Sequence, residues 1–263
     1  LMFLFAGMTV ACGIGNGEYY TQTVEIPDSY TLEQKIELSG KVLPHPRQML
    51  WWEDEFKGFI HYGPNTYSGR EWGTGFEESD LFHPTGLDTD QWCELMSAAG
   101  MTRVVMVVKH HEGYCLWQTR YTDHSVASSA WKNGEGDVLK ELAKSCEKYG
   151  LRLGVYLSPA DLYQIESSGG YYGNGSEFTE RTIPRQVEGR PFSDTRSFTY
   201  LADDYNEYFL NQLFELLTEY GPIYEVWFDG ANPKPGTGQT YNYEAWYDLI
   251  RQLAPDAVIF GKG

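Results

Sequence analysis

The sequence predicts an α/β protein, a (β/α)8 barrel of the TIM type that is truncated after about five β/α units. Apolar runs of strand length alternate with segments of helical periodicity in one unbroken series, as in right-handed βαβ units with a parallel sheet. Polar residues follow the ends of these apolar runs, and a barrel carries its active site at that edge. No glycine-rich phosphate-binding fingerprint opens the first predicted helix, which weakens the alternative of a doubly wound nucleotide-binding fold.

Each predicted strand and helix has its own signal. The segment 102–111 is a continuous apolar run of the kind that parallel sheets bury. In the helical segment before it, Trp92, Leu95 and Met96 recur at helical spacing, and Gly100 gives a C-terminal stop. The strands are expected at Phe56–Gly63, Thr102–His111, Arg152–Pro159, Ile223–Phe228 and Ala257–Gly261, and the helices at Asp88–Gly100, Asp137–Gly150, Asp204–Gly221 and Tyr243–Pro255.

The N-terminal residues predict export. Residues 1–12 form an apolar run that ends in small residues and Cys12, which is typical of the tail of a secretory signal peptide. Thr9–Cys12 loosely matches the cleavage box of bacterial lipoproteins, so a lipid anchor at Cys12 and a periplasmic or cell-surface location are expected. The polar residues 13–50 are interpreted as a tether and lead-in, and the barrel is expected over residues 51–263, incomplete at its C-terminus.

The composition disfavours some partners and favours others. With 37 acidic against 20 basic residues the formal net charge is −17, which argues against nucleic acid and anionic membrane surfaces as partners. A hydrophobic share of 41% supports a core, and 8 Trp and 20 Tyr residues include rings that suit stacking on sugars. The three cysteines other than Cys12 show no metal-binding spacing, so we expect no disulfide framework, metal or cofactor.

A carboxylate, Asp229, follows the apolar run 223–228. It either caps a turn or is aimed at a ligand, and its position alone leaves both interpretations open. Histidines follow two other predicted strands: His61 comes after the first, and His110 and His111 end the second. Successive strand residues face opposite sides, so His110 and His111 both point inward only if the strand has already turned.

Three histidines and an aspartate also fit a metal site. Metallohydrolase barrels usually place their ligands in an alternating His-x-His pattern on one strand, and that pattern is missing here. Imidazole and Trp rings around a carboxylate better suit a sugar pocket, in which hydroxyl groups are hydrogen-bonded and the apolar face of the sugar is stacked.

Five motifs resemble the successive barrel motifs of glycoside hydrolase family 29, the α-L-fucosidases. They are GFIHYGPNTYSGREWGTG, FHPTGLDTDQW, VVKHHEGYCLW, LRLGVYLSPAD and YGPIYEVWFDGAN, and their order and spacing are kept from Trp51 to Gly263. The forms HYGPNTYSGREWG and WKNGEGDVLKEL look most like the branch that acts on α-1,3/1,4-linked fucose. The resemblance implies an exo-glycosidase that removes terminal α-L-fucose from fucosylated oligosaccharides or glycoconjugates.

The resemblance also implies a role for individual residues. It implies a retaining, double-displacement mechanism with Asp229 of WFDG as the nucleophile. Retaining enzymes need a second carboxyl group as acid/base. The resemblance assigns Glu71 to sugar binding instead and implies that the acid/base glutamate lies beyond residue 263, in which case the chain is an N-terminal fragment. The implied fucose pocket consists of His61, Glu71, Trp72, His110, His111, Tyr156 and Trp227.

Three features depart from the family pattern. Glu112 stands where an aspartate is common, Ala160 stands where a tryptophan is often found, and a Gly/Ser-rich insertion lies in residues 162–203. Loops at that place rim a barrel's active site, but we interpret the segment as a tolerated surface insertion. Two other functions stay open: a catalytically idle fucose-binding barrel, and a metal-dependent hydrolase on the same barrel.

Overall fold

The computed structural model describes residues 24–230, 233–234 and 236–261. The chain divides into two compact units, Leu1–Glu53 and Asp54–Gly263, and each is described by itself. The signal-peptide remnant and the lipid attachment site predicted at Cys12 lie outside the described residues. No helix within the described part of the chain combines the length and the apolar character that a membrane span requires.

The first unit contains two short helices, α1 (Leu32–Ser39) and α2 (Pro46–Glu53), where the sequence suggested only a tether. Helix α1 begins with a capping box: Thr31 Oγ1 accepts a hydrogen bond from the Gln34 backbone N–H at 3.3 Å, and Gln34 Oε1 accepts from the Thr31 N–H at 2.9 Å. Neither helix contains a buried residue.

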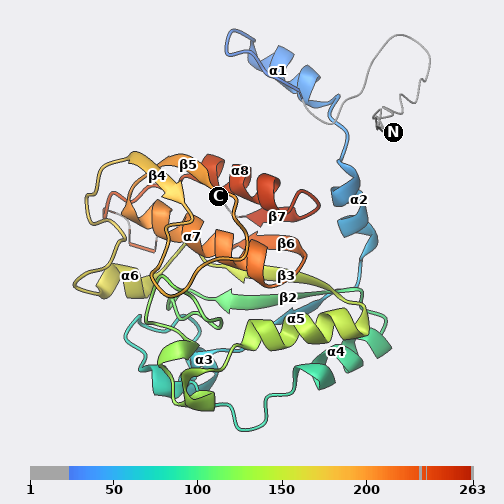
Figure 1. The fold of residues 1–263 in the computed structure, drawn as a ribbon. Helices are drawn as coiled ribbons and strands as arrows, with labels where there is room; N and C mark the ends of the chain where they lie inside the picture. Colours follow the sequence, from blue (N-terminus) through green and yellow to red (C-terminus); the bar gives the residue numbers. More distant parts are fainter. Residues whose placement is uncertain (1–23, 231–232, 235, 262–263) are drawn as a thin grey trace, which may run out of the picture. The chain divides into compact units, whose positions relative to one another are not determined.

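The second unit is built on a five-stranded parallel sheet with the order β1-β2-β3-β6-β7. Figure 1 shows its strands side by side, with α4 and α5 along β2 and α7 and α8 along β6 and β7. The expected α/β fold with a parallel sheet is therefore confirmed. The strands are β1 (Gly58–Ile60), β2 (Arg103–Lys109), β3 (Arg152–Leu157), β6 (Ile223–Phe228) and β7 (Val258–Gly261).

The four predicted helices are present, and each begins next to a polar capping residue. Asp88, Asp137, Asp203 and Asn242 each accept a hydrogen bond from a backbone N–H in the first helical turn. The helices are α4 (Thr89–Ala98), α5 (Val138–Tyr149), α7 (Asp204–Glu219) and α8 (Tyr243–Leu253). Shorter elements are α3 (Pro64–Ser68), α6 (Leu162–Glu166) and the 3-10 turns η1 (Ser79–Leu81), η2 (Val126–Ser128) and η3 (Trp131–Gly134).

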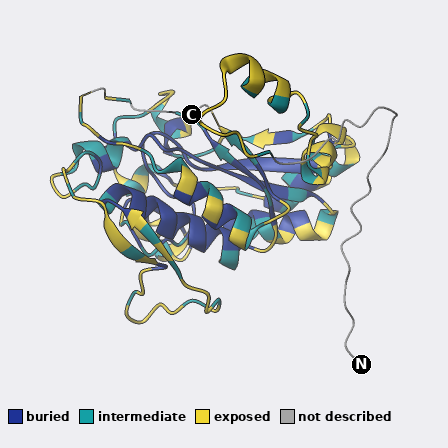
Figure 2. Cartoon of the chain, turned by 90° about the horizontal axis from the view of Figure 1, so that it is seen from above, coloured by how far each residue is buried: buried dark blue, intermediate teal, exposed yellow. Residues whose placement is uncertain are grey.

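The two faces of the sheet belong to different hydrophobic clusters. Val104, Met106 and Val108 of β2 pack in the large core together with apolar residues of α4, α5, α7 and α8. The alternate residues Val105 and Val107 form a separate small cluster with Tyr156, against which Trp227 packs. The central strands of the sheet appear largely dark blue in Figure 2, whereas the helices show dark blue on only part of their surface. The helices therefore cover one face of the sheet, unlike in a doubly wound fold, where they cover both.

A buried charge cluster lies near the beginning of the strands. Arg103 Nη2 contacts Asp54 Oδ2 at 2.7 Å, and Arg103 Nη1 lies 3.6 Å from Glu225 Oε2. Gly154 is opposite Glu225, and a Cβ atom at Gly154 would lie 2.9 Å from that of Glu225. Glu225 is the polar residue within the predicted apolar strand. Arg103 neutralises its charge, and Gly154, which has no side chain, leaves space for it.

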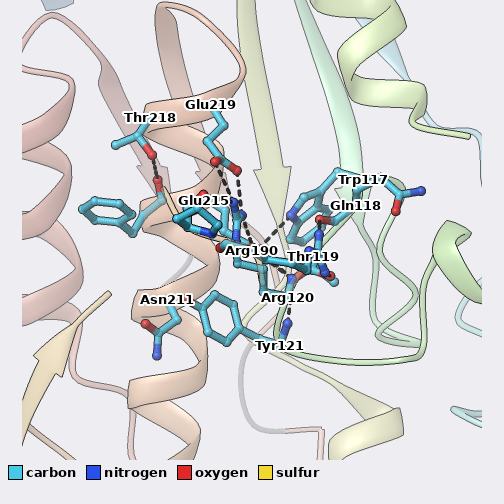
Figure 3. A network of polar contacts seen from close by, with 12 residues as sticks. Trp117, Gln118, Thr119, Arg120, Tyr121, Arg190, Asn211, Glu215, Thr218 and Glu219 are labelled. Carbon is cyan, nitrogen blue, oxygen red and sulfur yellow. Dashed lines mark hydrogen bonds and ion pairs between the residues drawn. The ribbon is translucent and has the colours of Figure 1, made fainter. Parts of the chain in front are cut away.

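Residues 162–203 hold a β-hairpin that the sequence did not reveal. Its strands β4 (Thr179–Ile183) and β5 (Phe198–Ala202) pair antiparallel. Arg190, in the segment between them, donates to the carbonyls of Thr119 at 2.8 Å and Gln118 at 2.5 Å. Figure 3 shows how this contact joins a wider network around Arg120, Glu215 and Glu219. The insertion is therefore tied to the loop after β2 and, through Arg120, to α7.

The cysteines described by the structure are buried and free. They are Cys93, Cys115 and Cys146. Cys93 on α4 and Cys146 on α5 face each other, with their sulfur atoms 3.9 Å apart.

Candidate active site

Asp229 lies directly after β6, and the alternation of the strand determines where its side chain points. Glu225, Trp227 and Asp229 are separated by steps of two residues, so they share the face of the sheet that the helices do not cover. Asp229 Oδ2 accepts a hydrogen bond from the Tyr156 hydroxyl at 3.0 Å, and Oδ1 accepts from the Gly230 backbone N–H at 2.9 Å. One carboxylate oxygen thus stabilises the turn at Gly230, and the other accepts a hydrogen bond from Tyr156 on the neighbouring strand β3.

Both histidines after β2 are buried, because the strand has ended before them. Strand β2 stops at Lys109, and its register with β3 shifts between Val107 and Lys109, as at a β-bulge. The rings of His110 and His111 lie 4.0 Å apart, and that of His110 is stacked 5.8 Å from the ring of Tyr156. The expectation that the strand must turn for both side chains to point inward agrees with this geometry.

A serine and a glycine fix the second histidine. His111 Nδ1 lies 2.6 Å from Ser158 Oγ, and this oxygen is also within hydrogen-bond distance of the carbonyls of Ala160 and Asp229, at 2.7 and 3.1 Å. Since a hydroxyl has one proton and carbonyls only accept, the network favours His111 Nδ1 as a donor. A Cβ atom at Gly230, whose φ is +84°, would lie 2.5 Å from His111 Cε1.

The remaining predicted residues surround the two histidines. The ring of His61 lies 4.4 Å from that of His110, and the ring of Trp72 lies 4.2 Å from that of His111. Trp227 packs 6.3 Å from Tyr156 between ring centroids. The charge of Glu71, an exposed side chain, acts on His110. The structure brings the predicted rings and Asp229 into one cluster, with the charge of Glu71 acting on it, although these residues span 61–229; their individual roles stay predictions.

The imidazoles of His61 and His110 are neutral at physiological pH. Burial lowers the pKa of His110 to about 4, although the negative charges of Asp229 and Glu71 oppose this shift. Burial and the neighbouring His110 also lower the pKa of His61. Burial and the charge of Asp229 raise the pKa of Tyr156, so its hydroxyl keeps the proton that it donates to Asp229. The site therefore offers neutral hydrogen-bonding groups around a carboxylate.

Several residues of the site were not identified from the sequence. Ser158 and Gly230 position His111, while Phe59 and Phe260 flank Trp227 at ring distances of 5.4 and 4.0 Å. For Gly230 the sequence did contain a signal, because a glycine directly after a strand often allows another part of the protein to approach the backbone closely. The other contacts join residues far apart in the sequence, and no local pattern reveals them.

Among the described residues, no group of three or more His, Cys, Asp or Glu side chains is arranged to hold a metal ion. The cluster consists of aromatic rings, imidazoles, the exposed Glu71 and, among the rings, the carboxylate of Asp229 at the carboxyl ends of parallel strands. A site of this kind is suited to a neutral, hydroxyl-rich ligand with an apolar face, and its carboxylate can act on an electrophilic carbon.

The parallel α/β fold and this site together define a domain of the glycosidase type. A family model described as Alpha-L-fucosidase matches residues 41–261, and the chain belongs to this family, glycoside hydrolase family 29. The chain is 39% identical to α-L-fucosidase 1 of Arabidopsis thaliana over 218 residues, which are 83% of this chain and 37% of the plant protein. The chain thus spans little more than a third of the length of this relative.

Two solved structures show the same fold. A glycoside hydrolase 29 family member from a rumen bacterium is 38% identical, with a TM-score of 0.67, and the match covers 84% of this chain and 36% of that one. A glycoside hydrolase 29 fucosidase of Ruminococcus gnavus, determined in complex with fucose, is 29% identical with a TM-score of 0.62. That match covers 81% of this chain and 41% of the R. gnavus chain.

Proposed function

We propose that the full-length protein is a retaining exo-α-L-fucosidase in which Asp229 is the nucleophile. The observation that carries the proposal is the position of Asp229. Its carboxylate ends a strand among the rings of His110, Tyr156 and Trp227, within a chain of the α-L-fucosidase family. The hydroxyl of Tyr156 and the N–H of Gly230 both donate to this carboxylate, and such donors favour its ionised form.

In the first step of the proposed reaction, Asp229 Oδ attacks the anomeric carbon of the fucosyl group. A bond forms between that carbon and the carboxylate oxygen, while the glycosidic bond breaks and the leaving oxygen takes a proton from an acid/base residue. In the second step, water gives a proton to the same acid/base residue and displaces Asp229, which regenerates the carboxylate. The two inversions together retain the configuration of the sugar.

The surrounding side chains are suited to holding fucose. The indole Nε1–H of Trp227 is buried without a hydrogen-bond partner among the described residues, so it is a donor available to a sugar hydroxyl. The neutral rings of His61 and His110 and the ring of His111 supply further donors and acceptors, and Glu71 supplies an acceptor. The partly exposed Trp72, 42% accessible, offers a ring for stacking on the apolar face of the sugar.

The remaining parts of the proposal concern the whole protein. We place the acid/base glutamate C-terminal to residue 263 and the five-stranded sheet within a complete (β/α)8 barrel, since the chain matches 37% of its Arabidopsis relative. We also propose α-1,3/1,4-linked fucose as the substrate linkage, and export with a lipid anchor at Cys12. Metabolic labelling with a palmitate analogue tests the anchor: label on wild type but not on Cys12→Ser is expected.

The nucleophile is tested by covalent trapping in the full-length protein. A 2-deoxy-2-fluoro-fucosyl fluoride should add one fluorofucosyl group to the peptide that contains Asp229. The Asp229→Ala variant should remain unlabelled, and its kcat should fall by about 10³ or more. Asp161→Asn is the control, because Asp161 lies between β3 and α6, where it caps the helix and pairs with buried Lys109 at 3.0 Å. It should lower stability and still become labelled; label on a residue other than Asp229 contradicts the proposal.

A further inference from the structure

Glu112 is a buried carboxyl group that touches the candidate site and has no role in the proposed reaction. It is 2% exposed. Its Oε2 atom accepts a hydrogen bond from Asn65 Nδ2 at 2.7 Å and lies 3.4 Å from His110 Nδ1. Among the described residues, no lysine or arginine forms an ion pair with Glu112. A buried carboxyl group without a cationic partner is more stable as the neutral acid.

Two other carboxyl groups of this fold each receive several hydrogen-bond donors. Glu77 accepts from the backbone N–H groups of Thr74 and Gly75 at 2.6 and 2.9 Å, and from the Thr74 hydroxyl at 2.9 Å. The fully buried Glu215 accepts from Trp117 Nε1, Thr119 Oγ1 and both the backbone and the guanidinium of Arg120. Glu112 receives only the amide of Asn65 and its own backbone N–H, so its negative charge would be less stabilised.

The groups that face Glu112 do not compensate its charge. They are His61 after β1, Glu77 after α3, His110 and His124 on either side of it in the loop after β2, and Tyr156 on β3. Burial lowers the pKa of His61, His110 and His124, and it raises the pKa of Tyr156, so none of these groups supplies a positive charge at neutral pH. Burial raises the pKa of Glu112 itself to about 8, and the charge of Glu77 acts in the same direction.

An acceptor beside Glu112 lacks a donor. Nδ1 of His110 is buried without a hydrogen-bond partner among the described residues, and Glu112 Oε2 lies 3.4 Å from it. We propose that Glu112 is protonated in the folded protein and donates from Oε2 to Nδ1 of His110, which makes it a positioning residue of the site. Because Nδ1 of His110 accepts this hydrogen bond, the ring proton lies on Nε2. His110 is thereby fixed in the Nε2–H tautomer, in which Nε2 can donate a hydrogen bond.

The protonation of Glu112 and the tautomer of His110 are properties of the folded protein and can be measured without an enzymatic assay. Their effect on turnover rests on the proposed function. Nitrogen-15 NMR of the full-length protein labelled at histidine reads the tautomer directly, with the His110 signal identified by its loss in His110→Asn. At pH 7 we expect the neutral Nε2–H tautomer in wild type. The same tautomer is expected in Glu112→Gln, because a glutamine NH2 group in the place of Oε2 has two protons, one for Nδ1 of His110 and one for the otherwise unpartnered Oδ1 of Asn65 once the Asn65 amide is turned over. An Nδ1–H tautomer or an imidazolium in wild type overturns the proposal.

Fucosidase activity gives the second readout. Glu112→Gln should keep kcat/KM within about threefold of wild type at pH 7. In wild type, deprotonation of Glu112 should lower the activity above about pH 8, and this decrease should be absent in Glu112→Gln. Glu112→Ala, which removes the donor, should lose about tenfold or more. Equal losses in the two variants, or an unchanged alkaline limb in Glu112→Gln, overturn the proposal. An inactive wild type contradicts the proposed function instead, and the NMR result then still decides the protonation.

Discussion

At the scale of single residues, the surroundings of a buried carboxyl group determine whether it is ionised. Its protonation state in turn makes the free energy of unfolding depend on pH. The folded-state pKa of Glu112 is about 8, against an ordinary value of 4.5. Between these values the folded state binds more protons at Glu112 than the unfolded state, so the stabilisation that Glu112 contributes is complete below pH 4.5 and is lost as the pH rises through this window. The fall should approach about 1.4 kcal/mol for each pH unit within it.

This pH dependence is tested by comparing wild type with Glu112→Gln from pH 5 to pH 8 in the full-length protein. The stability of the wild type should decrease relative to the variant over this range. His110 and His124, each with a pKa lowered to about 4, favour the folded state as the pH rises toward 6.5. Their contribution is common to both proteins and cancels in the difference. Parallel stability curves would contradict a protonated Glu112.

Gly230 is a residue whose lack of a side chain is required by the site. An alanine there would place Cβ 2.5 Å from Cε1 and 2.8 Å from Nδ1 of His111, at a φ of +84°. Gly230→Ala should therefore displace His111 and lower kcat/KM by about tenfold or more. Gly175→Ala is the matched control, since its φ of +77° is similarly strained but nothing lies within 4 Å of the added Cβ. The control should lose about 1 kcal/mol of stability and keep its activity; equal activity in the two variants would contradict the positioning of His111.

At the scale of elements, the buried network of Figure 3 joins the loop after β2, the insertion and helix α7. Arg120 donates to Glu215 at 3.1 Å and to both carboxylate oxygens of Glu219 at 2.7 and 2.8 Å. Its Nε donates to the Arg190 carbonyl at 2.8 Å, and its guanidinium lies 3.9 Å from the ring centre of Phe192. The insertion therefore contributes to the structure of the loop that carries His110 and His111, beyond being a tolerated surface addition.

Glu215→Gln should be strongly destabilising, because it removes the charge that Arg120 and three neutral donors share in the interior. Breaking a buried ion pair typically costs about 3–5 kcal/mol. The control is Asp194→Asn, which breaks an ion pair with the half-exposed Arg196 and should cost less than about 1 kcal/mol. Thermal melts of the full-length variants provide the comparison, and similar shifts in both would contradict the structural role of the network.

The elements also show what the sequence could predict. Apolar runs identified β2, β3 and β6, and helical spacing with the closing Gly100 placed α4 within a few residues. The strand predicted at Phe56–Gly63 is shorter in the structure, since β1 covers only Gly58–Ile60. The hairpin β4–β5 was missed, because exposed strands with polar residues such as Glu180 and Arg181 lack the apolar pattern of a buried strand.

At the scale of the whole molecule, the parallel strands explain why distant motifs meet. The motifs that contain His61, His110, Tyr156 and Asp229 each follow or end a strand of one sheet, and their carboxyl ends lie at one edge. The predicted set of site residues depended on this topology together with the family resemblance. Contacts such as Asn65 to Glu112 and His111 to Ser158 depend on side-chain packing between loops and could not be predicted from local patterns.

The face of the sheet that lacks helices should make the chain of 263 residues prone to self-association when expressed alone. Phe59 on that face is 47% exposed, and β1 and β7 each pair with one neighbouring strand. Exposed apolar surface and unpaired strand edges favour aggregation. Light scattering should show assemblies for the isolated chain and a single species for the full-length protein. A monodisperse isolated chain with a sharp cooperative melt would contradict this expectation.

The central claim is that Asp229 is the nucleophile of a fucose pocket, and azide rescue of Asp229→Ala in the full-length enzyme tests it most directly. Removing the carboxylate abolishes the covalent intermediate, while azide can occupy the vacated space and attack the anomeric carbon. The account predicts that azide restores cleavage of an activated α-L-fucoside and that the product is the inverted β-fucosyl azide. Near-normal activity of Asp229→Ala without azide would contradict the account, and Asp229 would then serve only the turn that it forms with Gly230.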